Sequence, residues 1–323
     1  MTQKVLVLGA TGGIGGEVAR QLRDAGWQVQ ALQRGLAHSS ETREGIVYLR
    51  GDALNRDDVM RAAQGCSVLV HAVNPPGYRR WNEWVLPMMD NTIAAALKEG
   101  ATIVLPGTVY NFGPDAFPRL TEDSPQHPLT RKGQIRVQLE QRLHAATQQG
   151  ARAIVLRSGD FFGPRAGNSW FSQGMIKPGH AVKRINLPSD PGVGHQWAYL
   201  PDVAQTMVQL LSHRERLAPF SNFHMAGYWD ADGTQIATAI ARCVERDGGQ
   251  AKMRAFPWWL ARLVSPFVTT LRELLEMRYL WQQPLRMDNR RLLAVLGAEP
   301  HTPLEQAVEA TLKGLGCLSL PNP

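Results

Sequence analysis

Residues 4–15 read KVLVLGATGGIG, a short apolar run that passes directly into glycines. A buried strand, then a glycine-rich turn, then a helix is the context that a dinucleotide-binding turn requires. Glycines at this spacing allow a tight turn and bring backbone N–H groups and the helix N-terminus against a pyrophosphate. A purely structural turn is the alternative. The residues predicted to bind a cofactor here are Gly9, Thr11, Gly12, Gly13, Ile14 and Gly15.

The strand-then-helix pattern repeats through the first half of the chain. Apolar runs rich in β-branched residues predict buried strands, and segments of helical periodicity lie between them. The predicted strands are 5–8, 29–32, 46–49, 67–73, 102–105 and 154–156, and the predicted helices are 13–25, 56–63, 83–99, 131–148 and 202–211. This alternation indicates an α/β fold with a Rossmann-type, doubly wound parallel sheet.

The pattern changes after about residue 165, where loops rich in Gly and Pro begin. We therefore expect a dinucleotide-binding domain over residues 1–165, with a returning segment near 195–225. Residues 166–323 are expected to form mainly a smaller C-terminal substrate lobe.

Composition excludes several classes of protein. The 323 residues are 44% hydrophobic and 20% charged, which is typical of a globular chain and not of a disordered or fibrous one. Three widely separated cysteines, Cys66, Cys243 and Cys317, build neither a disulfide framework nor a metal knuckle, so we expect a cytoplasmic protein without a metal site. No stretch has the length and hydropathy of an export signal or a membrane-spanning helix.

The net charge of +7 is concentrated near the C-terminus. Residues 252–291 carry eight basic and three acidic side chains, an excess of five. A solvated helical face is the favoured interpretation, over an anionic substrate, a membrane surface or nucleic acid, because no nucleic-acid motif accompanies the charge. Apolar residues in the same segment are expected to form a lid or lobe surface over a cleft rather than a membrane anchor, because two prolines interrupt a long helix. They are Phe256, Trp258, Trp259, Leu260, Leu263 and Phe267.

The end of the second predicted strand indicates which dinucleotide binds. An acid usually stands there to contact the ribose hydroxyls of NAD, but this chain has Gln33 and Arg34. A cation here favours a 2′-phosphate, so NADP(H) is expected and NAD(H) is possible. An ordinary exposed arginine is the alternative. Asp52, followed by Ala53, is placed to accept from the adenine amino group, or else to cap the helix that starts near Asn55.

With these residues in view, the chain resembles the extended or atypical branch of the short-chain dehydrogenase/reductase superfamily, the NAD-dependent epimerase/dehydratase-like proteins. The resemblance covers nearly the whole chain. It rests on the glycine turn and on Gly51-Asp52, Val70-His-Ala-Val73, Gly107-Thr-Val-Tyr-Asn-Phe-Gly113, Arg157-Ser-Gly-Asp-Phe-Phe-Gly-Pro164 and His195-Gln-Trp-Ala-Tyr-Leu-Pro-Asp-Val-Ala204. Further cofactor contacts that it implies are Ala72, Val73, Asn74, Arg136 and Ser158.

The resemblance implies hydride transfer at a carbon that bears oxygen, with a Tyr-x-x-x-Lys pair on one helix face as proton donor and ribose holder. This chain departs from that pattern. The matching helix has Lys132 where tyrosine is expected and Arg136 where lysine is expected, and no tyrosine in the chain is followed by lysine four residues later. Arg136 retains the ribose contact and the positive charge, but a guanidinium does not exchange protons.

Two hypotheses follow for the chemistry. In the first, Lys132 donates the proton, Thr108 orients the substrate oxygen, and Tyr110 is a second candidate acid. In the second, Lys132 is an ordinary helix lysine, and the chain is a redox-silent NADP(H)-binding sensor or assembly protein. His71 is interpreted as structural, and His195 is expected near cofactor phosphates or substrate. The expected partners are a small-molecule substrate and, through the helices at 83–99 and 131–148, a second copy in a homodimer.

Overall fold

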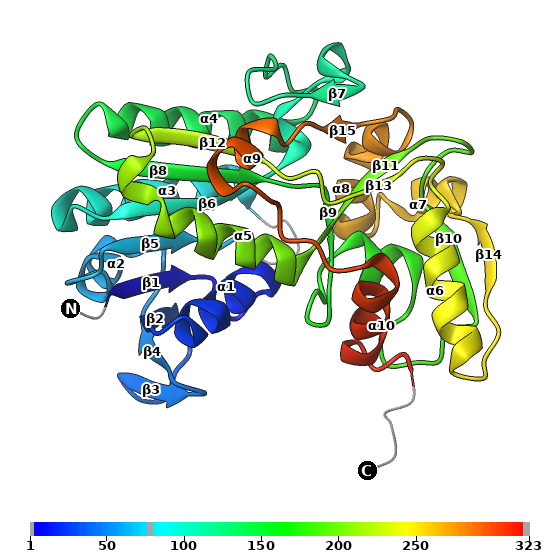
Figure 1. The fold of residues 1–323 in the computed structure, drawn as a ribbon, viewed down its shortest axis with the longest axis horizontal. Coiled ribbons are helices and arrows are strands. Elements are labelled where there is room, and N and C mark those ends of the chain that lie inside the picture. The colour runs from blue at the N-terminus through cyan, green and yellow to red at the C-terminus, as the bar shows by residue number, and fades with distance from the viewer. Residues whose placement is uncertain (1–2, 76–79, 319–323) are drawn as a thin grey trace.

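The computed structural model describes residues 3–75 and 80–318. A parallel sheet with helices on both faces occupies one half of the molecule, and a mixed lobe occupies the other (Figure 1). Within the described ranges the main sheet has the order β12-β8-β6-β5-β1-β2-β4-β3. Its strands are β1 (Lys4–Leu8), β2 (Gln28–Gln33), β3 (Ser40–Arg43), β4 (Ile46–Arg50), β5 (Val68–His71), β6 (Thr102–Gly107), β8 (Arg152–Arg157) and β12 (Phe220–His224).

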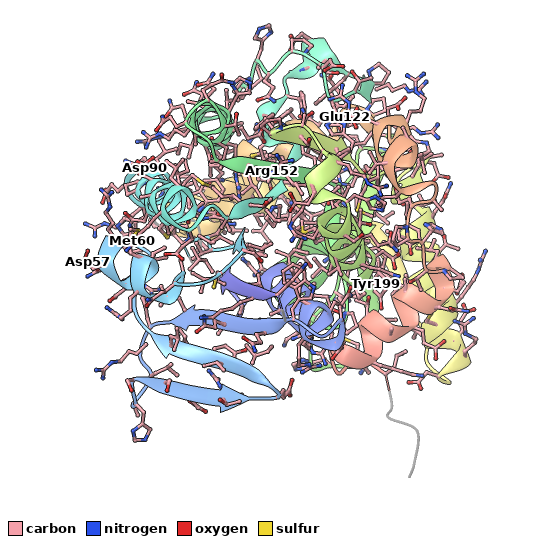
Figure 2. The ribbon with its side chains drawn as sticks, turned by 60° about the vertical axis from the view of Figure 1, so that its left-hand side comes forward. Asp57, Met60, Asp90, Glu122, Arg152 and Tyr199 are labelled. Carbon is pink, nitrogen blue, oxygen red and sulfur yellow. The ribbon has the colours of Figure 1, made fainter. Side chains whose placement is uncertain are left out.

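Helices cover both faces of this sheet, which confirms the predicted doubly wound fold. One face packs against α1 (Gly13–Asp24) and α5 (Leu200–Ser212). The other packs against α2 (Arg56–Ala62), α3 (Trp81–Glu99) and α4 (Arg131–Thr147). Figure 2 shows Met60 of α2 and Asp90 of α3 on the same side of the sheet, with Tyr199, just before α5, on the other. The apolar runs that predicted the strands are buried because both of their faces are covered.

Sequence patterning did not predict β12 as a strand, and it also missed strand β3. It pairs antiparallel with β4 at the sheet edge, and its four residues, SETR, are all exposed. A strand with no buried face has no hydrophobic alternation from which to predict it. The other strands of the sheet pair in parallel. Because the chain runs from β1 to β2 in one direction and places β5 on the other side of β1, ligand binding is expected at the carboxyl ends of these strands.

The lobe has an aromatic core of its own, which includes Phe162, Trp197 and Trp281. Its strands are β9 (Asp160–Phe162), β10 (Arg184–Leu187), β11 (His195–Tyr199), β13 (Tyr228–Asp230) and β14 (Lys252–Ala255). Its helices are α6 (Gln235–Arg246), α7 (Trp258–Val264), α8 (Thr269–Glu276) and α10 (Leu304–Gly314). Among the described residues, no helix is long and apolar enough to span a bilayer.

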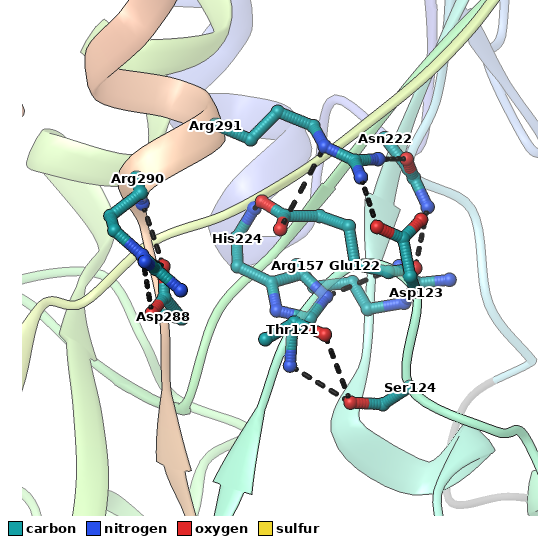
Figure 3. A network of polar contacts seen from close by, with 10 residues as sticks. All are labelled: Thr121, Glu122, Asp123, Ser124, Arg157, Asn222, His224, Asp288, Arg290 and Arg291. Carbon is teal, nitrogen blue, oxygen red and sulfur yellow. Dashed lines mark hydrogen bonds and ion pairs between the residues drawn. The ribbon is translucent and has the colours of Figure 1, made fainter.

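The C-terminal part of the chain returns to the sheet after it has built the lobe. Strand β15 (Arg286–Met287) pairs with β7 (Arg119–Leu120), and α9 (Arg290–Leu296) packs beside β12. Figure 3 shows the polar contacts that hold this return. Arg291 donates to Asn222 at 2.7 Å and to Asp123 at 2.6 Å, and the backbone N–H of His224 donates to Glu122 at 3.0 Å. The loop after β7, strand β12 and helix α9 are therefore joined in one network.

Candidate functional site

A groove of about 590 Å³ opens at the carboxyl ends of β1, β2 and β4. Most of the residues predicted to bind a cofactor line it, although they come from separate segments of the chain. The predicted residues in its lining are Gly9, Thr11, Gly12, Gly13, Ile14, Gln33, Arg34, Asp52, Ala53, Ala72, Val73 and Asn74. The sheet thus brings together the glycine turn, the end of β2 and the loop after β5.

The glycine turn is packed so closely that side chains are excluded from it. Gly9 has φ +92°, and a Cβ there would lie 2.5 Å from the carbonyl oxygen of Ala72. A Cβ on Gly15 would lie 2.3 Å from the Gly9 carbonyl oxygen, so Gly15 packs the helix onto the turn and does not itself line the groove. The Gly12 N–H donates to that same Gly9 carbonyl at 2.9 Å. This bare backbone at the start of α1 fits the pyrophosphate of a dinucleotide.

The end of β2 presents one cation, Arg34, to the groove. The Arg34 guanidinium is 60% exposed and lies 4.0 Å from the Asp52 carboxylate. Arg43, on the unpredicted strand β3, donates to the side-chain oxygen of Gln33 and lies over the Tyr48 ring. Asp52 also accepts from the backbone N–H of Leu54 at 3.0 Å. It does not cap α2, because the Asn55 side chain accepts from the N–H groups of Asp57 and Asp58 in that role. Arg43 was missed because its segment carried no strand signal.

A second cavity of about 170 Å³ continues the groove toward the lobe. The two share the segments 72–75 and 168–169, together with Ile14 and Phe161. Three predicted catalytic residues, Thr108, Tyr110 and Arg136, line this inner cavity. The Arg136 guanidinium donates to the Asn74 side chain at 3.2 Å and lies 5.2 Å from the centre of the Trp81 ring. It therefore lies between the cofactor groove and the inner cavity.

Thr108 begins the 3-10 helix at Val109–Asn111 and fixes the loop after β6. Its hydroxyl accepts from the Tyr110 N–H at 3.3 Å and donates to the Asn111 side chain at 3.4 Å. Gly133 in α4 passes under this loop, where a Cβ would lie 2.2 Å from the Tyr110 carbonyl oxygen. The loop after β6 therefore packs tightly against the N-terminal turn of α4. This packing fixes the position of Thr108 relative to α4, as binding of a substrate oxygen between them would require.

Lys132 and Ser158 do not line either cavity. Lys132 is buried, and its ammonium lies 3.1 Å from the Glu276 carboxylate of α8. Glu276 also accepts from the backbone N–H of Arg131 at 2.9 Å, so it sits at the positive end of α4. Ser158 is buried behind the strand end, and its hydroxyl has no hydrogen-bond partner among the described residues.

His71 lines the inner cavity and is held as a neutral imidazole. Burial, followed by the charge of Arg136, lowers the pKa of His71 to about 3. The Thr92 hydroxyl donates to the Met88 carbonyl at 3.0 Å, so it accepts from His71 Nδ1 at 2.8 Å. Nδ1 therefore carries the proton, and Nε2 keeps its lone pair. This contact agrees with the structural role expected for His71.

Asp160 is a residue of the inner cavity that the sequence-based predictions did not include. Asp160 follows β8 and lines the inner cavity, and its carboxylate lies 2.7 Å from His195 Nε2. The His195 ring stacks on Trp281 at 3.6 Å between centroids. His195 lines neither the groove nor the inner cavity. It was expected near cofactor phosphates or substrate, but Asp160 lies between it and the inner cavity. Asp160 stands in the Arg157–Pro164 motif, and that position could have identified it.

The apolar residues predicted to form a lid or lobe surface over a cleft divide into two sets. Phe256 and Trp258 pack in the lobe core, where the Trp258 indole donates to the Pro188 carbonyl at 3.0 Å. Trp259, Leu260, Leu263 and Phe267 are exposed. None of the six lines the groove or the inner cavity, where Leu274 of α8 is present instead. The described residues also contain no group of three or more His, Cys, Asp or Glu side chains arranged to hold a metal.

A parallel sheet with a glycine cradle, a dinucleotide-sized groove and an adjoining inner cavity defines a Rossmann-fold protein of the nicotinamide-dependent class. The model of the NAD dependent epimerase/dehydratase family matches residues 5–226, and the chain belongs to that family.

Sequence and structure comparisons agree with this membership. The chain is 25% identical over 246 residues to the spore coat polysaccharide biosynthesis protein SpsK of Bacillus subtilis, covering 73% of this chain and 78% of that protein. A putative epimerase from Burkholderia cenocepacia superposes with a TM-score of 0.73 at 15% identity over 98% of both chains. UDP-glucose 4-epimerase from Bifidobacterium longum, solved with NAD+ and UDP, superposes with a TM-score of 0.71 at 12% identity over 97% of this chain and 98% of that one.

Proposed function

We propose that this chain is an atypical oxidoreductase or epimerase-type enzyme that binds NADP(H) and acts on a small hydroxyl- or carbonyl-bearing substrate. The observation that carries the proposal is the continuity of the groove with the inner cavity, because it joins the glycine cradle to Thr108 and Arg136. A bound nicotinamide supplies hydride transfer. The inner cavity is lined by polar groups on several sides, which suits a sugar ring of the kind handled by the UDP-sugar epimerases among its structural neighbours.

The residues of the site divide the remaining tasks. The Thr108 hydroxyl holds the reacting oxygen, and Arg136 holds the ribose and keeps a positive charge beside the nicotinamide position. Lys132 is the proposed proton donor, and it reaches the substrate through a rotation away from Glu276 or through an intervening water. Tyr110 is the second proposed acid, and it already lines the cavity.

The proposed preference for NADP(H) rests on charge. Arg34 lines the groove at the end of β2, where a 2′-phosphate would add negative charge, and Arg43 of β3 reaches the neighbouring Gln33 side chain. Solved neighbours hold NAD, so NAD(H) remains the competing cofactor. Direct titration with NADPH and NADH distinguishes them, and tighter binding of NADH would contradict this part of the proposal.

One observation favours a second candidate, a redox-silent NADP(H)-binding sensor or assembly protein. The lysine that replaces the family tyrosine is ion-paired with Glu276 and does not line the cavity. A broad screen of sugars, sugar nucleotides, alcohols and carbonyl compounds separates the two candidates. Nicotinamide absorbance detects net oxidation or reduction, and NMR of the products detects epimerisation, which returns the cofactor to its starting state. Turnover that is lost in Thr108→Ala supports the enzyme, whereas tight NADPH binding without turnover of any compound supports the sensor.

A further inference from the structure

Large apolar side chains that are exposed concentrate in one segment of the described chain. Trp259 is 73% exposed, Leu263 67% and Phe267 90%. Together with Leu260 they form the α7 patch, defined here as Trp259, Leu260, Leu263 and Phe267. Single exposed apolar residues are ordinary on protein surfaces, but several large ones side by side mark a surface that is covered by something.

The helical positions in α7 show that the patch faces away from the lobe. Trp258 and Ala261 are buried and attach the helix to the lobe core. Trp259 and Leu263 are four residues apart and therefore share one face, opposite the buried pair. A surface helix normally presents polar residues on that outer face. Here the outer face is apolar, so burial in the lobe does not account for it.

Exposed cations lie close to the α7 patch along the chain. Arg262 is exposed between Leu260 and Leu263 in the chain, and Lys252 and Arg254 are exposed on β14. Glu276, an acidic residue in the same part of the lobe, is already paired with Lys132. Another acid of the basic segment, Asp288, is paired with Arg119 and Arg290. The surroundings of the patch are therefore complementary to a negatively charged partner.

We propose that the α7 patch docks on the surface of an anionic lipid bilayer. Tryptophan and phenylalanine insert readily at the boundary of headgroups and acyl chains, and arginine beside them pairs with anionic headgroups. Helix α7 has 7 residues, so it lies in the interface and does not cross it. Helix α8 follows α7 in the chain and carries Leu274, which lines the inner cavity.

Vesicle flotation of the full-length protein tests the proposal. With vesicles of phosphatidylcholine plus phosphatidylglycerol, the wild type is expected to float, and added salt is expected to weaken binding. The variant Trp259→Ser, Leu263→Ser, Phe267→Ser is expected to bind these vesicles at least about tenfold more weakly than the wild type. The matched variant Trp259→Phe, Leu263→Met, Phe267→Leu keeps the apolar area and is expected to float like the wild type.

The charge component has its own pair of variants. Arg262→Ser is expected to weaken binding to the phosphatidylglycerol vesicles about fivefold. Lys98→Ser removes an exposed cation from α3 instead and is expected to have no effect. This pair tests the proposal even if the triple serine variant does not fold, which thermal unfolding will show.

Two results would overturn the proposal. One is a wild type that does not float with phosphatidylglycerol vesicles at low salt. The other is self-association in the absence of lipid that the triple serine variant abolishes, because the α7 patch would then be a contact between protein copies.

Discussion

Glu276 of α8 and Lys132 of α4 form an ion pair across the two halves of the molecule, with 3.1 Å between Oε2 and Nζ. The same carboxylate accepts from the N–H of Arg131 at the start of α4. One lobe side chain therefore holds both the helix end and Lys132, the proposed proton donor. Whether Lys132 works as an acid or as a structural cation, it does so under the control of Glu276.

Lys132→Ala is expected to lower turnover by about 10² while leaving NADPH affinity within about twofold. The reason is that Lys132 lies outside the lining of the cofactor groove. Steady-state kinetics and calorimetric titration measure the two effects. Glu276→Gln is the matched variant, because it keeps the size of the side chain and removes the charge that faces Lys132. It is expected to shift the pH profile of turnover. Unchanged turnover in an active Lys132→Ala variant would transfer the role of acid to Tyr110.

Arg34→Ala is expected to weaken NADPH binding about tenfold and to leave NADH binding nearly unchanged. The guanidinium lies in the groove lining next to Asp52. At this position NADPH carries a negatively charged 2′-phosphate on its ribose, and NADH does not. Arg56→Ala, which removes an exposed arginine of α2 outside that lining, serves as the control. Equal losses for the two cofactors would contradict the assignment.

Glu140→Ala is expected to lower the free energy of unfolding by about 3–5 kcal/mol, because it leaves the Arg157 guanidinium buried without its carboxylate. Arg157 is 0% exposed and donates to Glu140 from β8. Asp90→Ala breaks the exposed ion pair with Arg142 and is expected to cost about 0–1 kcal/mol. Urea unfolding measures both, and similar small losses would show that the buried pair contributes little.

Stability is expected to fall as pH decreases below about 6.5. Burial, followed by nearby arginine charge, lowers the pKa of both His71 and His224 to about 3. Above the ordinary pKa both states are neutral, but below it the unfolded chain binds protons that the folded chain does not. Each histidine contributes a slope of about 1.4 kcal/mol per pH unit.

Urea midpoints between about pH 7 and pH 5 test this expectation. His71→Asn retains a donor for Thr92 and is expected to reduce the slope by about one proton. His38→Asn changes an exposed histidine and is expected to leave the slope unaltered. A slope that His71→Asn does not change would show that His71 titrates normally in the folded protein.

A homodimer through α3 and α4 stays a prediction. Two large apolar residues of α3 are used within the chain itself, since Met88 is buried and Trp84 lines the cofactor groove. Light scattering is expected to give the mass of a dimer, and Ala145→Arg, on an exposed position of α4, is expected to give a monomer. A wild-type monomer at micromolar concentration would refute the prediction.

Local signals made much of the fold and the cofactor groove predictable. Buried strands such as β1 and β5 carry unbroken apolar runs, and the requirement for glycine at Gly9 follows from its turn. The pairing of Lys132 with Glu276 joins segments that are far apart in the chain, and no local pattern indicates which of them meet. Arg43 was missed for a different reason, because a fully exposed edge strand carries no periodic pattern.

The network in Figure 3 bears on how the chain is made and how it could be divided. The network joins Glu122 and Asp123 to Asn222 and Arg291. Asn222 belongs to β12, which pairs with β8 although it follows the first part of the lobe in the sequence. A fragment ending near residue 165 would leave the edge of β8 open to pairing with other chains, so it is expected to aggregate. The main sheet is therefore completed by a strand, Phe220–His224, that is synthesised after the first part of the lobe, and Arg291 contacts that strand from still later in the chain.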